Sequence, residues 1–257
     1  MTSQPAQIDA IYRYPVKGLS PQALKRTALA LGATLPADRL YAIENGPSGF
    51  DPAAPAYFPK QRFLMLMRNE RLAALRTDYD EGSHTLAIHA DGHMAARGDL
   101  RTPEGRAVIE RFFASYCAAE LRGPPKVLSG QGHSFSDVAK KVVSVINLAS
   151  VAAVANAAGA PVDPLRFRGN IYVAGWSAWH EFDLLGREFT VGPSARVKVI
   201  KRIVRCAATD VDPATGIRDL SIPRTLTQSF GHGDCGVYAE VVAPGDIAIG
   251  DEVRVLA

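Results

Sequence analysis

The stretch KRIVRCAATDVDPATG, residues 201–216, places a single cysteine between a basic run and a turn. Lys201, Arg202 and Arg205 precede Cys206 within five residues. Nearby cations favour loss of a thiol proton, and a thiolate can bind a soft metal or act as a nucleophile. Alternate side chains of a strand face the same way, so not all three cations can point at the sulfur. By itself the stretch is therefore more typical of a structural thiol beside a solvated basic face than of a reactive one.

The residues after this cysteine predict a turn at the end of a strand. In DVDPATG, residues 210–216, Asp and Pro favour the turn and Gly216 closes it. Thr209 adds a hydroxyl group just before it. Loops that leave strands often carry site residues, and guanidinium groups match the geometry of phosphate. The stretch is thus also suited to binding an anion.

The composition is that of a globular protein and excludes several classes. The 257 residues, of which 47% are hydrophobic and 21% charged, suffice for one large domain or two smaller ones with a real core. A net charge of +3 gives no support for nucleic-acid binding. No charge-free apolar run of ~18 residues is present, so we expect no membrane association. The N-terminal residues also lack the pattern of a secretory signal.

The three cysteines, Cys117, Cys206 and Cys235, favour a reducing, cytoplasmic location, because they are too few and odd in number for a disulfide framework. They cannot supply a four-cysteine iron–sulfur cluster, so an electron carrier of that kind would be a separate protein. Cys117 lies on the apolar face of the helix predicted over residues 102–121, which indicates a buried thiol. Cys235 is interpreted as a buried thiol at a strand start, with a substrate-facing role left open.

Short β-type runs dominate the chain and predict an α+β, mainly β fold. Two helices are expected, over residues 102–121 and 149–158. Many short strands with few helices favour a barrel or sandwich, and no glycine-rich nucleotide motif is present. The Gly-, Pro- and Ser-rich residues 121–137 predict a boundary between domains 1–125 and 126–257. The predicted strands lie within residues 7–18, 38–46, 72–79, 141–148, 170–176, 187–192, 195–206 and 235–256.

One tempting metal motif is a histidine pair four residues apart. His89 and His93 would share a face of a helix, but Asp91 and Gly92 between them predict a two-residue hairpin turn. The helix that such a metal site needs is therefore not expected.

Motifs spread from about residue 9 to residue 256 resemble the MOSC domain family. VRCAATDVDPATG (204–216) is similar to its C-terminal signature, and GVYAEVVAPGDIAIGDEVRVL (236–256) to its closing pattern. RFRGNIYVAG (166–175) resembles its F-R-x-N-I-V-V segment. Three further segments resemble the N-terminal β-barrel domain that is associated with MOSC domains: IYRYPVKG (11–18), DRLYAIENG (38–46) and FPKQR (58–62). The resemblance implies an N-terminal β-barrel-like domain packed on a C-terminal MOSC β-barrel with a few helices.

Within that family the chain is similar to molybdenum enzymes of the mitochondrial amidoxime reducing component type. The resemblance implies a molybdenum–molybdopterin cofactor (Moco) between the two domains, with Cys206 as the metal ligand and catalytic residue. Basic side chains from distant segments suit the pterin phosphate, because charge-assisted hydrogen bonds are the strong ones. The residues that it implies for cofactor binding are Lys17, Arg39, Arg168, Asn170, Arg205 and Thr209.

The activity implied by the resemblance is reduction of N-hydroxylated compounds, or of N- or S-oxides. The electrons would come from a separate electron-donor protein. The sequence departs from the family pattern where hydroxyl groups are expected: Gly18, Val204 and the pair Val138-Ala139 replace Ser or Thr. Backbone N–H groups and Lys140 are the candidate replacements for the missing donors.

Two alternative functions stay open. A thiolate flanked by cations also suits a sulfur carrier or transferase that holds a persulfide on Cys206. The pyridoxal-phosphate domain of cofactor sulfurases is missing from this sequence, so the sulfur would have to come from another protein. The lost hydroxyl groups favour a second alternative, a non-catalytic binder of the cofactor or of another anion.

Overall fold

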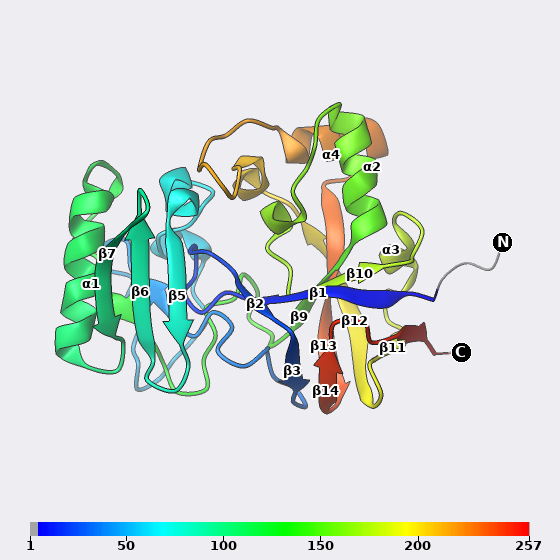
Figure 1. The fold of residues 1–257 in the computed structure, drawn as a ribbon, viewed down its shortest axis with the longest axis horizontal. Helices are drawn as coiled ribbons and strands as arrows, with labels where there is room; N and C mark the ends of the chain where they lie inside the picture. The colour runs from blue at the N-terminus through cyan, green and yellow to red at the C-terminus, as the bar shows by residue number, and fades with distance from the viewer. Residues whose placement is uncertain (1–4, 257) are drawn as a thin grey trace.

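The computed structural model describes residues 5–256 and shows two lobes of unequal size (Figure 1). The larger lobe contains an eight-stranded sheet in the order β15-β11-β12-β13-β9-β10-β1-β2. All of its pairs are antiparallel except the parallel pair β9–β10. Its strands are β1 (Gln7–Arg13), β2 (Gln22–Leu24), β9 (Val143–Asn147), β10 (Ile171–Ala174), β11 (Glu188–Val191), β12 (Ala195–Val204), β13 (Asp234–Ala243) and β15 (Val253–Val255).

This sheet curls so that β15 at one end shares hydrogen bonds with the region of β1, the strand next to the other end. Ile8 N of β1 donates to Asp251 O at 2.9 Å, and Val253 N of β15 donates to Ala6 O at 2.8 Å. Side chains that alternate along β12, such as Val197 and Val199, point into the core enclosed by the curl. The predicted mainly β class with a barrel-like sheet is confirmed.

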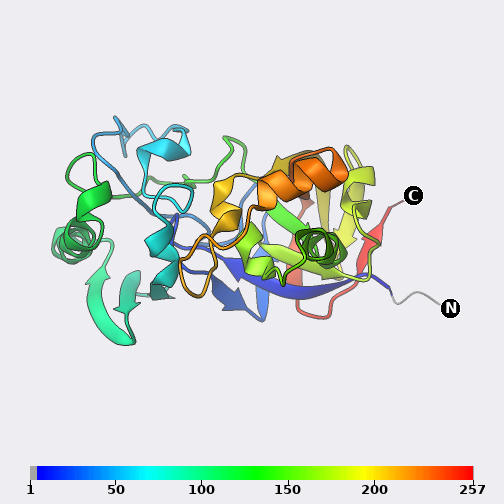
Figure 2. The ribbon, with the colours of Figure 1, turned by 90° about the horizontal axis from the view of Figure 1, so that it is seen from above.

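Three helices accompany the larger lobe: α2 (Leu148–Ala158), α3 (His180–Asp183) and α4 (Ile222–Phe230). Helices α2 and α4 lie side by side over one face of the sheet (Figures 1 and 2). Asn147 caps α2 by accepting from Ala149 N at 3.0 Å, and Gly159 ends it with φ +66°, a conformation that favours glycine. The predicted helix over residues 149–158 is thus confirmed.

The smaller lobe contains a sheet of β5 (Arg76–Asp80), β6 (Thr85–Ala90) and β7 (His93–Asp99), covered by α1 (Pro103–Tyr116). Thr102 caps α1 by accepting from Gly105 N at 3.0 Å. The helix is shorter than the predicted 102–121, since the chain continues from Cys117 into a 3₁₀ turn at Ala118–Glu120. The predicted hairpin turn at Asp91-Gly92 is confirmed, with φ values of +51° and +79°.

One predicted strand is mostly wrong, and another is half confirmed. Of residues 38–46, only β4 (Ala42–Ile43) is a strand, and it pairs with β8 (Val127–Leu128). The positive φ of Arg39, +52°, is incompatible with extended backbone and delays the strand. Of residues 72–79, the first part belongs to the 3₁₀ turn Glu70–Ala74, and β5 begins only at Arg76.

The larger lobe is built from both ends of the chain. Strands β1 and β2 precede the smaller lobe in sequence but pair within the large sheet. Strand β3 (Arg26–Leu29) likewise pairs with β14 (Gly245–Ala248). The domain boundary between residues 125 and 126 stays a prediction. In the structure, strands from before this boundary contribute to the larger lobe. Among residues 5–256, no helix combines the length and apolar character needed to cross a membrane.

Candidate functional site

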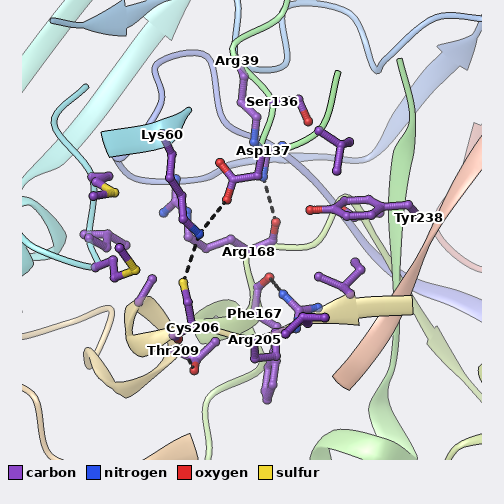
Figure 3. A pocket seen from close by; sticks show the side chains of 18 of the residues that line it. Arg39, Lys60, Ser136, Asp137, Phe167, Arg168, Arg205, Cys206, Thr209 and Tyr238 are labelled. Atoms are coloured by element: carbon purple, nitrogen blue, oxygen red, sulfur yellow. Dashed lines mark hydrogen bonds and ion pairs between the residues drawn. The ribbon is translucent and has the colours of Figure 1, made fainter. Parts of the chain in front are cut away.

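A cavity of about 230 Å³ is lined by residues from both lobes, and Cys206 lies on its wall (Figure 3). A second cavity, of about 20 Å³, has room for about one water molecule. The larger cavity is therefore the candidate binding site. Every site residue predicted from the sequence lines it: Lys17, Arg39, Arg168, Asn170, Arg205, Cys206 and Thr209.

Cys206 lies two residues after the end of β12 and directly before the 3₁₀ turn Ala207–Asp210. Its carbonyl oxygen accepts hydrogen bonds from Thr209, at 3.0 Å from the backbone N and 2.9 Å from Oγ1. These bonds fix the backbone of the cysteine, while its side chain is only half-buried. The sulfur faces the cavity, where Lys60 Nζ lies 3.3 Å from Sγ.

Lys60 is the residue that sequence reasoning missed. It begins the 3₁₀ turn Lys60–Arg62 of the first half of the chain, within the FPKQR segment, yet it contacts the cysteine 146 positions later. Burial alone would lower the pKa of Lys60, but Asp137 and Cys206 beside it raise that pKa. The sequence offered one signal for Lys60: it is a basic residue in a segment that resembles the family. No neighbouring residue indicates that its side chain reaches the Cys206 sulfur.

Asp137 joins two ammonium groups across the cavity. One of its carboxylate oxygens pairs with Lys17 Nζ, and the other lies 3.4 Å from Lys60 Nζ. Lys17 is 6% exposed and also donates to Phe135 O at 2.8 Å. Burial lowers the pKa of Lys17, and Asp137 opposes this shift. Removal from water would raise the pKa of Asp137, but the two lysines hold it well below its usual range.

Arg39 and Arg168 form a second basic group on the cavity wall. Their guanidinium carbons lie 4.9 and 4.2 Å from the ring centroid of Tyr14. Arg39 pairs with Asp38 and donates to Arg168 O at 3.0 Å, while Arg168 donates to Leu19 O at 2.9 Å. Both arginines have positive φ, +52° and +51°, which is uncommon for non-glycine residues and clusters at functional sites.

Desolvation distinguishes this arginine pair from surface arginines. Burial lowers the pKa of Arg168, and the positive charge of Arg39 adds to the effect. The hydroxyl group of Tyr14 beneath them is buried and has no hydrogen-bond partner among the described residues. Two partly desolvated guanidinium groups on the cavity wall make a site that an anion would stabilise.

Asn170 and Arg205 also line the cavity, but their polar atoms bond to the protein. Asn170 Oδ1 accepts from Ser144 N at 3.0 Å and Ser144 Oγ at 2.8 Å, and its Nδ2 donates to Tyr12 O at 3.1 Å. Arg205 donates to Cys235 O, at 2.7 Å from Nε, and to Phe167 O, at 2.8 Å from Nη1. These two residues hold strands in register around the cavity, and their direct contact with a cofactor stays a prediction.

One of the missing hydroxyl groups, at Gly18, has a local explanation. Gly18 has φ +84°, and a Cβ there would lie 3.0 Å from Leu64 O, so the backbone at this position favours glycine. Val204 is 69% exposed at the end of β12. Lys140 does not replace them, because its ammonium group pairs with Glu240 at 2.8 Å and it does not line the cavity. Lys60, by contrast, lines the cavity.

The other two cysteines are structural. Cys117 and Cys235 are 1% and 0% exposed, which confirms the prediction that both are buried thiols. Burial raises the pKa of each to about 12. At neutral pH both are therefore neutral side chains packed in the core, and Cys206 is the accessible thiol among the described residues.

Two models of protein families match the chain. Residues 5–119 match the MOSC N-terminal beta barrel domain, and residues 130–254 match the MOSC domain. The chain belongs to the MOSC domain family. Members of this family are associated with binding of the molybdenum cofactor or with sulfur-carrier activity. The predicted resemblance to both domains is thus confirmed.

Solved structures similar to this MOSC protein include three from bacteria. The YUAD protein from Bacillus subtilis is 12% identical, with 98% of this chain and 96% of that chain covered and a TM-score of 0.46. YiiM from Geobacillus stearothermophilus is 18% identical over 45% of this chain and 54% of that chain, with a TM-score of 0.35. YiiM from Escherichia coli has the same identity and coverage and a TM-score of 0.33. No curated protein matches the chain.

Proposed function

We propose that this MOSC protein is a molybdenum-dependent reductase of N-hydroxylated compounds, or of N- or S-oxides, supplied with electrons by a separate redox protein. The observation that carries the proposal is the meeting of Cys206 with two basic groups in one cavity. Lys60 lies at the sulfur, and Arg39 and Arg168 lie on the same cavity wall. The family association supports the same function.

The residues on the cavity wall fit a molybdenum–molybdopterin cofactor. Lys17, Arg39 and Arg168 offer charge-assisted donors for a phosphate group. Within residues 5–256, no cluster of three or more His, Cys, Asp or Glu side chains could hold a metal ion. A metal at Cys206 must therefore bring most of its own ligands, as the dithiolene and oxo groups of this cofactor do.

Each part of the cavity has a separate task in this proposal. Cys206 would hold the metal, and the bound cofactor would supply the two-electron redox chemistry. Lys60 donates to the sulfur and places a positive charge where an oxygen-bearing substrate arrives. Met65, Leu66 and Met67 form an apolar wall that excludes water from the sulfur's surroundings.

Metal and phosphorus analysis tests this function. We expect wild-type protein from a cofactor-producing host to contain molybdenum and phosphorus in equal amounts. Cys206→Ala should lose the molybdenum, and only the wild type should reduce an N-hydroxylated amidine with a chemical electron donor. Wild-type protein without molybdenum would contradict the proposal.

A sulfur carrier is the second candidate, and the Lys60–Cys206 contact favours it as well. The Cys206 thiolate would attack the terminal sulfur of a donor persulfide, the donor's S–S bond would break, and the donor would leave as a thiol. Mass spectrometry after exposure to a persulfide donor should show one added sulfur atom on wild type and none on Cys206→Ser. Molybdenum-free protein that gains this sulfur would favour the carrier over the reductase.

A further inference from the structure

Residues 207–218 form a loop that leaves the larger lobe after Cys206 and reaches the smaller lobe (Figures 1 and 2). The pairing of Val211 with Arg218 closes the base of the loop. Inside it, the Asp212 carboxylate accepts hydrogen bonds from two backbone N–H groups of the same loop, at 2.8 and 2.7 Å. The loop is therefore internally braced, and Arg218 projects from a fixed base.

The Arg218 side chain joins this loop to the facing wall of the cavity. Its Nη1 donates to the carbonyl oxygen of Ala207, the residue directly after the site cysteine. Its Nη2 donates to Leu66 O at 2.9 Å and to Met67 O at 2.8 Å. A carboxylate oxygen of Glu70 lies 3.2 Å from the same nitrogen and neutralises its charge. A single guanidinium group thus links backbone segments of the two lobes.

Both linked segments line the cavity. Leu66 and Met67 belong to its apolar wall, and Cys206 lies on the larger lobe. The position of Cys206 within the larger lobe is already fixed by its bonds with Thr209. What remains to be set is the gap between the sulfur and the apolar wall, and Arg218 bonds to backbone on both sides of that gap.

We propose that Arg218 is a positioning residue that sets this gap and so limits the size of the molecules that reach the Cys206 sulfur. Its effect on turnover rests on the proposed function, whereas its effect on access to the sulfur does not. The apolar wall suits a substrate with a compact apolar substituent next to its N-hydroxyl group, since methionine side chains adapt to irregular apolar shapes.

A second arginine provides a matched control. Arg76 of the smaller lobe donates to Pro213 O at 3.2 Å and to Ala214 O at 3.1 Å, near the tip of the same loop. It joins the same two lobes with the same chemistry. However, it contacts neither the residue next to Cys206 nor the apolar wall. Loss of either arginine should loosen the interface, but only loss of Arg218 should widen the gap.

The test uses molybdenum-free protein and compares rates of Cys206 modification by iodoacetamide and by the larger N-(1-pyrene)maleimide in wild type, Arg218→Gln and Arg76→Gln. For Arg218→Gln we expect the ratio of the pyrene rate to the iodoacetamide rate to rise about tenfold. The reason is that losing hydrogen bonds worth ~1.4 kcal/mol shifts the equilibrium between the narrow and the widened gap by this factor. Arg76→Gln should keep the wild-type ratio. In loaded enzyme, Arg218→Gln should raise kcat/KM for bulky N-hydroxylated substrates relative to small ones.

An unchanged ratio in Arg218→Gln, or an equal rise in Arg76→Gln, would overturn the proposal. If Arg218→Gln does not fold, Arg218→Lys takes its place. Lysine keeps the positive charge but lacks the several N–H donors of the guanidinium group, so it should give a smaller rise in the ratio. Failure of the proposed function is recognised separately, because protein without molybdenum would still show the change in thiol access.

Discussion

Cys235 lies on β13 and Cys206 lies two residues beyond the end of the neighbouring strand β12, yet their surroundings differ in every respect that matters for chemistry. Cys206 is half-buried, faces a cavity and has the ammonium group of Lys60 at 3.3 Å. Cys235 is 0% exposed, and burial raises the pKa of its thiol to about 12. Arg205 connects the two regions, because it precedes Cys206 in sequence and donates to Cys235 O. The reactivity of each thiol therefore depends on its exposure to solvent and on one cation that is distant in sequence. It does not depend on the residues next to the cysteine.

The largest expected effect is the difference in thiol reactivity between these regions. A rise in pKa from 9.0 to about 12 for Cys117 and Cys235 lowers their thiolate fraction about a thousandfold at neutral pH. Native, molybdenum-free protein treated with iodoacetamide should therefore gain one label per chain, and urea-unfolded protein three, by mass spectrometry. Native Cys206→Ser should gain none. Rapid labelling of Cys235 in native protein would break the comparison.

The second effect concerns the connection between the two regions. Arg205→Gln removes charge-assisted hydrogen bonds to Cys235 O and Phe167 O. We expect a loss of about 3 kcal/mol in the free energy of unfolding, since bonds to a charged group contribute ~1.5–3 kcal/mol each. Urea denaturation measures it. Arg224→Gln, at an exposed position of α4, is the control and should stay close to wild type.

A smaller effect is expected at Asp137, on the cavity side of the comparison. Asp137→Asn leaves the buried Lys17 without its carboxylate partner and should cost about 1 kcal/mol, because the 43% exposure of Asp137 screens the pair. The folded-state pKa of Asp137 is lowered, so its contribution is present above the usual Asp range and is lost as the pH falls through the lowered value. Denaturation at several pH values should show that the difference between wild type and variant shrinks in acid.

The smallest expected effect concerns the charge of Lys60. Lys60→Met should slow modification of Cys206 by the anionic reagent iodoacetate about fivefold more than by neutral iodoacetamide, since one partly exposed charge at ~4 Å contributes about 1 kcal/mol when water screens it. Lys60→Arg should restore most of the preference. Equal slowing of both reagents would show that Lys60 does not attract the incoming anion.

Local patterns predict much of the fold correctly. The strand within residues 195–206, the helix over residues 149–158, the Asp91-Gly92 turn and the apolar face that buries Cys117 were all predicted. These features depend on residues a few positions apart, so a short segment of sequence is enough to predict them. The same locality explains the misplaced strand before Ala42, where a positive φ at Arg39 has no signature in the sequence.

The order of residues alone shows a cysteine in a basic stretch, accompanied by family motifs that carry Lys17, Arg39 and Arg168. Which cation meets the sulfur depends on the fold: Lys60 does, whereas Arg205 is bonded to backbone carbonyl groups. The physical reason is that strand alternation fixes only on which side of a strand a side chain lies. The partner it finds there depends on chain segments more than a hundred residues away, which the fold brings together.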